Sequence, residues 1–202
     1  MNTRLVLASN NAKKLVELQT LFAPLDFEMV TQDALGVAEA EEPHITFIEN
    51  ALAKARHAAS LANAAAIADD SGLCVDALAG APGVLSARYA TLFGEPKSDA
   101  DNNRMLLQKM QGIDDRRARF VSALVALRSA DDPEPLVALG RWPGEILHAP
   151  RGDGGFGYDP LMFIPALGQT VAELSAEVKN RHSHRAIASR QMLALMREVW
   201  RG

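Results

Sequence analysis

Residues 4–14, with the sequence RLVLASNNAKK, join an apolar run to a polar turn and the start of a helical pattern. The run Arg4 to Ala8 is short and compact, which is typical of a buried strand. From Lys13 to Leu25, leucines and Phe22 recur at helical spacing, and Pro24 favours a helix end. The opening of the chain therefore predicts an α/β fold, in which strands and helices alternate.

The same alternation continues along the rest of the chain. Thr46 and Glu49 stand at capping-box spacing and open an alanine-rich helix predicted for Thr46 to Ala66. The turn 131–135, DDPEP, favours a hairpin between two longer strands. The other predicted elements are strands at Phe27 to Val30, Ala65 to Ala68, Ala118 to Leu127 and Leu136 to Ile146, and helices near Asp99 to Met110 and at Ser183 to Trp200. We expect a mixed sheet.

Composition limits the class of protein. The chain has 202 residues, of which 48% are hydrophobic and 23% charged, enough for one well-buried core with or without an attached lobe. A net charge of −4 argues against non-specific nucleic-acid binding. The single Cys74 excludes an internal disulfide framework and fits a reducing compartment. Without a signal segment or a long apolar stretch, we expect a cytoplasmic protein that does not enter a membrane.

Residues 9–14, SNNAKK, are a candidate phosphate-binding segment. They follow the first predicted strand and open the first predicted helix, whose N-terminus offers unpaired N–H groups to an anion. Ser9, Asn10 and Asn11 add hydrogen-bond donors, and the two lysines add positive charge. The alternative is that Asn10 or Asn11 only caps the helix, since the glycine spacing of a Walker motif is missing.

Asp69 and Asp70 follow the apolar run Ala65 to Ala68. Ligands of open α/β sheets bind where strands end, and Mg²⁺ prefers oxygen ligands. The two carboxylates are therefore candidates for a magnesium site, and Glu42 is a further acid within a loop. The alternative is a solvated turn, which Asp, Ser and Gly also favour.

Lys54 is a candidate phosphate ligand on the alanine-rich helix. It lies five residues beyond Glu49, a spacing that disfavours a surface ion pair and leaves the lysine available. A lysine that is simply solvated is the alternative.

The segment 152–160, GDGGFGYDP, is the most glycine-rich part of the chain. Glycines permit positive φ and close approach of the backbone to a ligand. Phe156 and Tyr158 suit stacking on a base, while Pro160 holds Asp159 extended. A long turn between strands is the alternative.

The segment 179–185, KNRHSHR, places cations at the start of the last predicted helix. Ser183 suits the N-cap, so His184 and Arg185 fall in the first turn, where positive charge opposes the helix dipole. A local rule that is broken without visible gain indicates a functional site. The alternative is a basic surface face.

Six segments stand in one order along the chain: SNNAKK at 9–14, FIENA at 47–51, ADDSGL at 68–73, PGVLSARY at 82–89, GFGYDP at 155–160 and SHR at 183–185. In this order and approximate spacing they resemble the inosine/xanthosine triphosphate pyrophosphatase family. The resemblance runs from Ser9 to Arg185, and six segments in order are specific where each alone is weak. Arg181 and His182 stand where the family often has a smaller or apolar pair, a departure that concerns only the shape of that loop.

The resemblance implies an α/β fold with a long mixed central sheet flanked by helices, related to the fold of Maf proteins. It implies that residues 1–202 form a single domain of two lobes, with the nucleotide in the cleft between them. It also implies a homodimer and Mg²⁺ as the cofactor. The implied activity is hydrolysis of ITP, dITP and XTP to the nucleoside monophosphate and pyrophosphate, which cleanses the nucleotide pool and prevents their incorporation into DNA and RNA.

The resemblance further implies roles for the matched residues. Asp70 corresponds to the catalytic acid, and Glu42 to its partner in binding Mg²⁺. The implied substrate-binding residues are Ser9, Asn10, Asn11, Ala12, Lys13, Lys14, Lys54, Ser71, Phe156, Gly157, Tyr158, Asp159, Lys179, His184 and Arg185. Those up to Lys54 would hold the triphosphate, Ser71 would contact the substrate, and those from Phe156 onward would form the base and sugar pocket.

Two roles of Asp70 remain open. It either deprotonates the attacking water or chiefly binds the metal, and a metal-bound carboxylate is a weak base, which favours the positioning of a metal-polarised water.

Donors on Lys179 and Arg185 would pair with the 6-oxo group of hypoxanthine or xanthine and leave the 6-amino group of adenine unmatched. Two other functions are a pyrophosphatase for modified pyrimidine or standard nucleotides, and a nucleotide-binding module without catalysis.

Overall fold

The computed structural model describes residues 3–9, 12–23 and 27–200. Its contacts divide the chain into two compact units. Unit 1 comprises Met1–Asp70, Ser122–Gly140 and His184–Gly202, and unit 2 comprises Ser71–Val121 and Arg141–Ser183. The single domain of two lobes that the resemblance implies stays a prediction, and each unit is described below by itself.

The strands form a seven-stranded sheet in the order β2-β1-β3-β4-β5-β6-β7. They are β1 (Thr3–Leu7), β2 (Phe27–Thr31), β3 (Ala65–Val75), β4 (Arg117–Leu127), β5 (Leu136–Ile146), β6 (Met162–Ile164) and β7 (Gln169–Thr170). Strand β1 pairs in parallel with β2 and β3, whereas β6 pairs antiparallel with β5 and β7. This confirms the prediction of an α/β fold with a mixed sheet.

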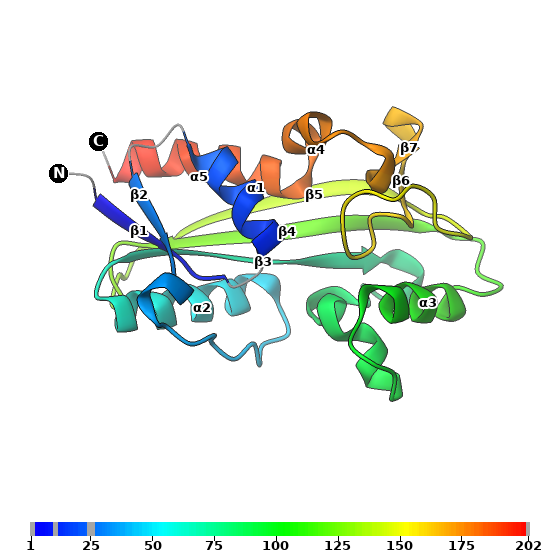
Figure 1. The fold of residues 1–202 in the computed structure, drawn as a ribbon, viewed down its shortest axis with the longest axis horizontal. Coiled ribbons are helices and arrows are strands. Elements are labelled where there is room, and N and C mark those ends of the chain that lie inside the picture. Colours follow the sequence, from blue (N-terminus) through cyan, green and yellow to red (C-terminus); the bar gives the residue numbers. More distant parts are fainter. Residues whose placement is uncertain (1–2, 10–11, 24–26, 201–202) are drawn as a thin grey trace. The chain divides into compact units, whose positions relative to one another are not determined.

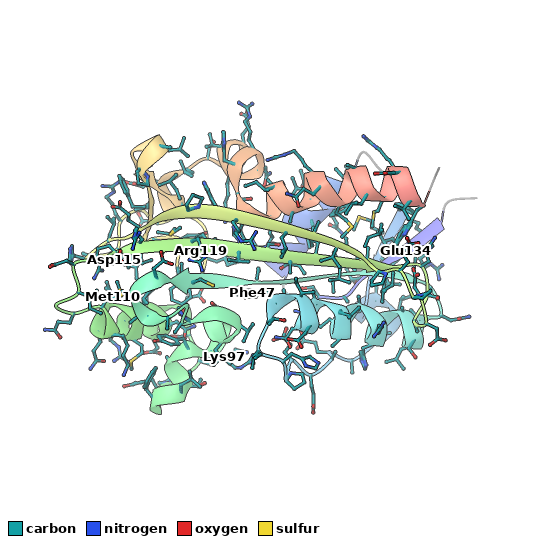
Figure 2. The ribbon with its side chains drawn as sticks, turned by 180° about the vertical axis from the view of Figure 1, so that it is seen from behind. Phe47, Lys97, Met110, Asp115, Arg119 and Glu134 are labelled. Atoms are coloured by element: carbon teal, nitrogen blue, oxygen red, sulfur yellow. The ribbon has the colours of Figure 1, made fainter. Side chains whose placement is uncertain are left out.

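The α-helices are α1 (Ala12–Phe22), α2 (Phe47–Ala62), α3 (Asp99–Lys109), α4 (Ala176–His182) and α5 (His184–Val199). Short 3-10 segments occupy Asp33–Leu35, Asp76–Leu78, Gly83–Phe93, Pro165–Leu167 and Val171–Glu173. The capping box predicted for α2 is present, since the Thr46 hydroxyl accepts a hydrogen bond from the Glu49 N–H and donates one to its carboxylate. Phe47, labelled in Figure 2, is the first residue of that helix.

In unit 1 the alternation of apolar residues along each strand serves two packing layers. Leu5 and Leu7 of β1 pack with α1 and α5, whereas Val6 and Ala8 pack with α2 on the other face of the sheet (Figure 1). The α2 layer is built from buried alanines, Ala51, Ala55, Ala58 and Ala59. Because these side chains are small, the helix can pack close to the strands. The polar residues in its first turns therefore lie near the sheet.

Two predicted boundaries are wrong at the junction of α2 and β3. Helix α2 ends at Ala62, because Asn63 adopts a left-handed conformation with φ of 46° and caps it. Strand β3 then continues beyond Ala68 as far as Val75. Asp69 and Asp70 therefore lie inside the strand rather than after its end.

The predicted hairpin joins β4 and β5, which are consecutive and adjacent in the sheet. The Asp132 carboxylate organises its turn by accepting hydrogen bonds from the backbone N–H groups of Arg128, at 2.9 Å, and Glu134, at 3.0 Å. The predicted turn residues thus have a direct physical role.

The core of unit 2 gathers residues from α3, the strands and the glycine-rich loop. Leu106 of α3 and Met110 pack in one buried cluster with Leu73 and Val75 of β3 and with Tyr158. Met110, labelled in Figure 2, follows the last residue of α3. Helix α4, which the sequence analysis did not predict, begins after Ser175, whose hydroxyl accepts a hydrogen bond from the Val178 N–H.

Candidate active site

Asp69 and Asp70 are adjacent in sequence but point to opposite faces of β3, as neighbouring residues of a strand do. Asp70 faces α2, where its carboxylate lies 3.0 Å from Lys54 Nζ. Asp69 faces α5, where its carboxylate accepts a hydrogen bond of 2.6 Å from Ser122 and lies 3.6 Å from Arg185 Nε. Their exposed fractions are 1% for Asp69 and 5% for Asp70, so the solvated-turn interpretation is wrong. The two acids do not form one paired carboxylate site.

Lys54 is the centre of the charged cluster in unit 1. Its Nζ donates to Glu42 Oε1 at 2.6 Å, to the Asp69 carbonyl at 2.8 Å and to Asp70 Oδ1 at 3.0 Å. The side chain is 13% exposed, so the interpretation of Lys54 as a simply solvated lysine is wrong. Burial alone would lower the pKa of Lys54, but the charges of Asp70 and Glu42 outweigh it and the pKa is raised. Lys54 therefore carries a full positive charge between the two acids.

Asn50 is a residue of this cluster that the sequence analysis missed. It is fully buried, and its amide both accepts from the His44 N–H at 3.0 Å and donates to the His44 carbonyl at 3.1 Å. The same amide nitrogen lies 3.5 Å from Asp70 Oδ2. Asn50 thus ties the loop that carries Glu42 to the strand that carries Asp70. Its position four residues before Lys54, on the same side of α2, is the signal that could have revealed it.

A second group of interacting residues lies in unit 2. The carboxylate of Asp159 accepts hydrogen bonds from Lys179 Nζ at 2.9 Å and from the Phe156 N–H at 3.0 Å. Lys179 Nζ also lies 4.6 Å from the centre of the Phe156 ring, which is a cation–π distance. Lys179 belongs to helix α4 rather than to the loop that the sequence analysis expected. The arrangement places the ammonium over one face of the Phe156 ring.

The glycines of the loop allow this geometry. Gly152, Gly155 and Gly157 all have positive φ, as the sequence analysis predicted for the segment. At Gly155 the space is also needed, because an added Cβ would lie 2.1 Å from Asp159 Oδ2. A side chain there would displace the carboxylate that holds Lys179.

Tyr158 does not have the stacking role that the sequence suggested. Its ring belongs to the buried core of unit 2 and is 4% exposed, and its hydroxyl donates to the Ser86 carbonyl at 2.9 Å. Burial raises the pKa of the Tyr158 hydroxyl, which therefore keeps its proton. The prediction of base stacking by Tyr158 is wrong because the ring supports the loop from within. Base stacking by Phe156 stays a prediction.

The remaining predicted residues lie in both units, most of them at element ends. Ser9 follows β1, and its N–H donates to the Leu7 carbonyl at 3.0 Å. Asn10 and Asn11 lie outside the described residues, as do the side chains of Ala12, Lys13 and Lys14, although α1 does begin at Ala12. Ser71 belongs to β3. His184 and Arg185 open α5, as predicted, and both are buried.

The carboxylates of unit 1 have the chemistry of a magnesium site. Over the described part of the chain, no three His, Cys, Asp or Glu side chains are grouped so as to hold a metal ion by themselves. Mg²⁺, however, is usually bound by one or two carboxylates together with substrate phosphates and water. Glu42 and Asp70 supply such a pair of oxygen donors, since both reach the same Lys54 ammonium.

Comparison with known proteins extends the similarity to the whole chain. The model of the Ham1 family matches residues 5–195. A dITP/XTP pyrophosphatase of Methylibium petroleiphilum is 69% identical, covering 98% of this chain and 99% of that protein. A dITP/XTP pyrophosphatase of Leptothrix cholodnii is 67% identical, covering 98% of each chain. The structure of a HAM1 protein from Coxiella burnetii superposes with a TM-score of 0.90 at 42% identity, covering 98% of this chain and 100% of that one. By sequence and by fold, the chain belongs to the Ham1 family.

Proposed function

We propose that this protein is a nucleoside triphosphate pyrophosphatase that hydrolyses ITP, dITP and XTP to the nucleoside monophosphate and pyrophosphate. The observation that carries the proposal is the largely buried cluster of Glu42, Lys54 and Asp70, in a chain 69% identical to a dITP/XTP pyrophosphatase. Removal of these nucleotides would keep them out of DNA and RNA.

The charged cluster of unit 1 suits attack at the α phosphate. Cleavage between the α and β phosphates builds negative charge on the leaving pyrophosphate, and fixed positive charge stabilises it. Lys54 supplies such a charge, because its raised pKa keeps the ammonium protonated. Asp70 is oriented by Asn50 and Lys54, so its carboxylate is held ready to accept a hydrogen bond from the attacking water.

Glu42 and Asp70 are the residues that would hold Mg²⁺. The ion, when bound, would neutralise phosphate charge and polarise water. In the structure the ammonium of Lys54 lies between these carboxylates, at 2.6 Å from Glu42 and 3.0 Å from Asp70. Lys54 would then shift part of its hydrogen bonding from the carboxylates to the triphosphate.

The loop and helix α4 of unit 2 suit recognition of the base. The Phe156 ring offers a face for stacking, and Lys179, whose ammonium lies over the ring, offers N–H donors to an acceptor such as a 6-oxo group. Asp159 anchors Lys179 and so fixes the position of its ammonium. Arg185 lies in unit 1 against Asp69, so its proposed role at the base is supported by the resemblance alone.

A cytoplasmic homodimer completes the proposal. Within the described residues no helix is long and apolar enough to cross a membrane. Sedimentation equilibrium of the purified protein would test the dimer, for which a monomeric mass would be contradictory.

Product analysis tests the activity. The purified protein would be incubated with ITP, XTP, GTP and ATP, once with Mg²⁺ and once with EDTA. We expect monophosphate and pyrophosphate from ITP and XTP, and no product with EDTA. Release of diphosphate and orthophosphate would contradict the proposed position of attack.

The same assay separates the other two functions. Turnover of modified pyrimidine or standard nucleotides in place of ITP would indicate a pyrophosphatase of different specificity. Nucleotide binding without any turnover would indicate a binding module.

A further inference from the structure

Two side chains of helix α3 form hydrogen bonds with the backbone of the glycine-rich loop at Gly157. The Gly157 N–H donates to the Asp99 carboxylate at 2.8 Å, and the Gly157 carbonyl accepts from the Asn103 amide at 2.8 Å. Asp99 and Asn103 are four residues apart and share one side of the helix. Both polar groups of one loop residue are therefore held by a single helix face.

Helix α3 is itself firmly supported within unit 2. Ser98 caps its first turn by accepting a hydrogen bond from the Asp101 N–H at 3.0 Å. The buried Asn102 accepts from the Ala90 N–H at 2.8 Å, and Leu106 packs in the core. Because helix α3 is held in place, it also fixes the position of Gly157, which it contacts.

Gly157 follows Phe156 directly and stands inside the turn that Asp159 closes. The turn is held from within by the bond between the Phe156 N–H and the Asp159 carboxylate, at 3.0 Å. The contacts from α3 hold it from outside. Since both polar groups of Gly157 already have partners, its backbone is better suited to fixing the loop than to binding the base, which was its predicted role.

We propose that Asp99 and Asn103 are positioning residues that set base specificity. They fix the plane of Phe156 relative to the Lys179 ammonium, which lies 4.6 Å from the ring centre. A purine stacked on Phe156 then presents its 6-position to the Lys179 donors, so a 6-oxo group is matched and a 6-amino group is not. When the hydrogen bonds to Gly157 are lost, the distance between the Phe156 ring and the Lys179 ammonium is no longer fixed. Discrimination between 6-oxo and 6-amino purines then falls. The inference rests on the proposed function and names what makes that site specific.

Substitution of each gripping residue tests the inference by steady-state kinetics. We expect Asn103→Ala and Asp99→Ala to lower kcat/KM for ITP about tenfold, mainly through KM, because each removes a hydrogen bond that orders the loop. The ratio of kcat/KM for ITP to that for ATP should fall by a similar factor. Asp99→Asn keeps an acceptor oxygen and should restore most of the ratio. Gln108→Ala, at an exposed position of the same helix, is the matched control and should leave the ratio unchanged.

Hydrogen exchange of the nucleotide-free protein tests, independently of activity, whether the contacts from α3 hold the loop. Asp99→Ala should accelerate amide exchange in the peptide that contains residues 155–159, while the control should not. Unchanged exchange would show that α3 does not hold the loop. Faster exchange with an unchanged ratio of kcat/KM for ITP to that for ATP would show that the contact has no role in specificity. A failure of the proposed function would show in the wild-type rates, whereas a failure of this inference would show in the ratio of variant to wild type.

Discussion

Two buried lysines serve the two candidate regions of the molecule in different ways. Lys54, on helix α2, contacts two oxygens of β3, from Asp69 and Asp70, and one of Glu42 in the loop before the helix. Lys179 contacts one carboxylate and one aromatic ring, both on a loop with several glycines of positive φ. A helix and a strand thus fix most of a dense group of charges, whereas the glycine-rich loop needs support from α3 and from Tyr158 to hold its shape. The first arrangement suits chemistry on phosphate, and the second suits recognition of a base.

The largest expected effect is on catalysis at Asp70. Asp70→Asn removes the carboxylate beside Lys54 but keeps the shape of the side chain, so we expect kcat for ITP to fall about 10³-fold. Asp69→Asn is the matched control, because that carboxylate faces α5, and we expect its kcat to fall far less. Equal losses in both variants would show that the face of the strand does not decide the role.

Removing each lysine measures how much charge it balances. Lys54→Met leaves the buried carboxylate of Asp70 and the partly buried one of Glu42 without their shared cation, so we expect a loss of about 3 kcal/mol in the free energy of unfolding. Lys179→Met leaves one, and we expect about half of that loss. Urea unfolding at neutral pH gives both values. A larger loss at Lys179 would contradict the comparison.

The raised pKa of Lys54 gives a test by pH. A lysine whose pKa is higher in the folded state than its ordinary value of 10.5 stabilises the fold fully below that value. The stabilisation is lost as pH rises through the folded-state pKa. We expect the stability difference between wild type and Lys54→Met to stay level up to about pH 10 and then to shrink. A difference that shrinks already near neutral pH would mean that another group is responsible.

The smallest expected effects separate space from conformation in the loop. Gly155 and Gly157 both have positive φ, but a Cβ would meet the Asp159 carboxylate only at Gly155. We expect Gly155→Ala to cost about 2 kcal/mol of unfolding free energy and Gly157→Ala about 1 kcal/mol. Thermal unfolding of the two variants would compare them. Similar losses would show that backbone conformation alone matters.

The sequence predicted those features whose cause is local. The apolar run of β1, the Thr46 capping box and the hairpin turn at Asp132 each depend on residues close together in the chain, and the structure confirms them. Family resemblance selected Asp70 and Glu42, and the structure brings both to one ammonium.

Other features depend on partners far apart in the sequence. Asn103 acts on the backbone of Gly157, 54 residues further along the chain, and no spacing in the sequence indicates this contact. A tyrosine in a glycine-rich loop has the same pattern whether it is exposed or buried, so Tyr158 was misassigned. The length of β3 was missed because Ser71 and Gly72 are typical turn residues, although both belong to the strand.

Because Asp69 and Asp70 point to opposite faces of β3, the register of this strand decides which carboxylate lies beside Lys54. A slip of β3 by one residue against its neighbours would exchange the two carboxylates and turn every apolar side chain of the strand to the wrong layer. The buried packing on both faces of β3 therefore keeps Asp70, the proposed catalytic acid, on the side of Lys54 and also stabilises the fold. Insertions or deletions of one residue between Ala65 and Asp70 should be far less tolerated than substitutions there, because a substitution changes one side chain whereas a frame change redirects them all.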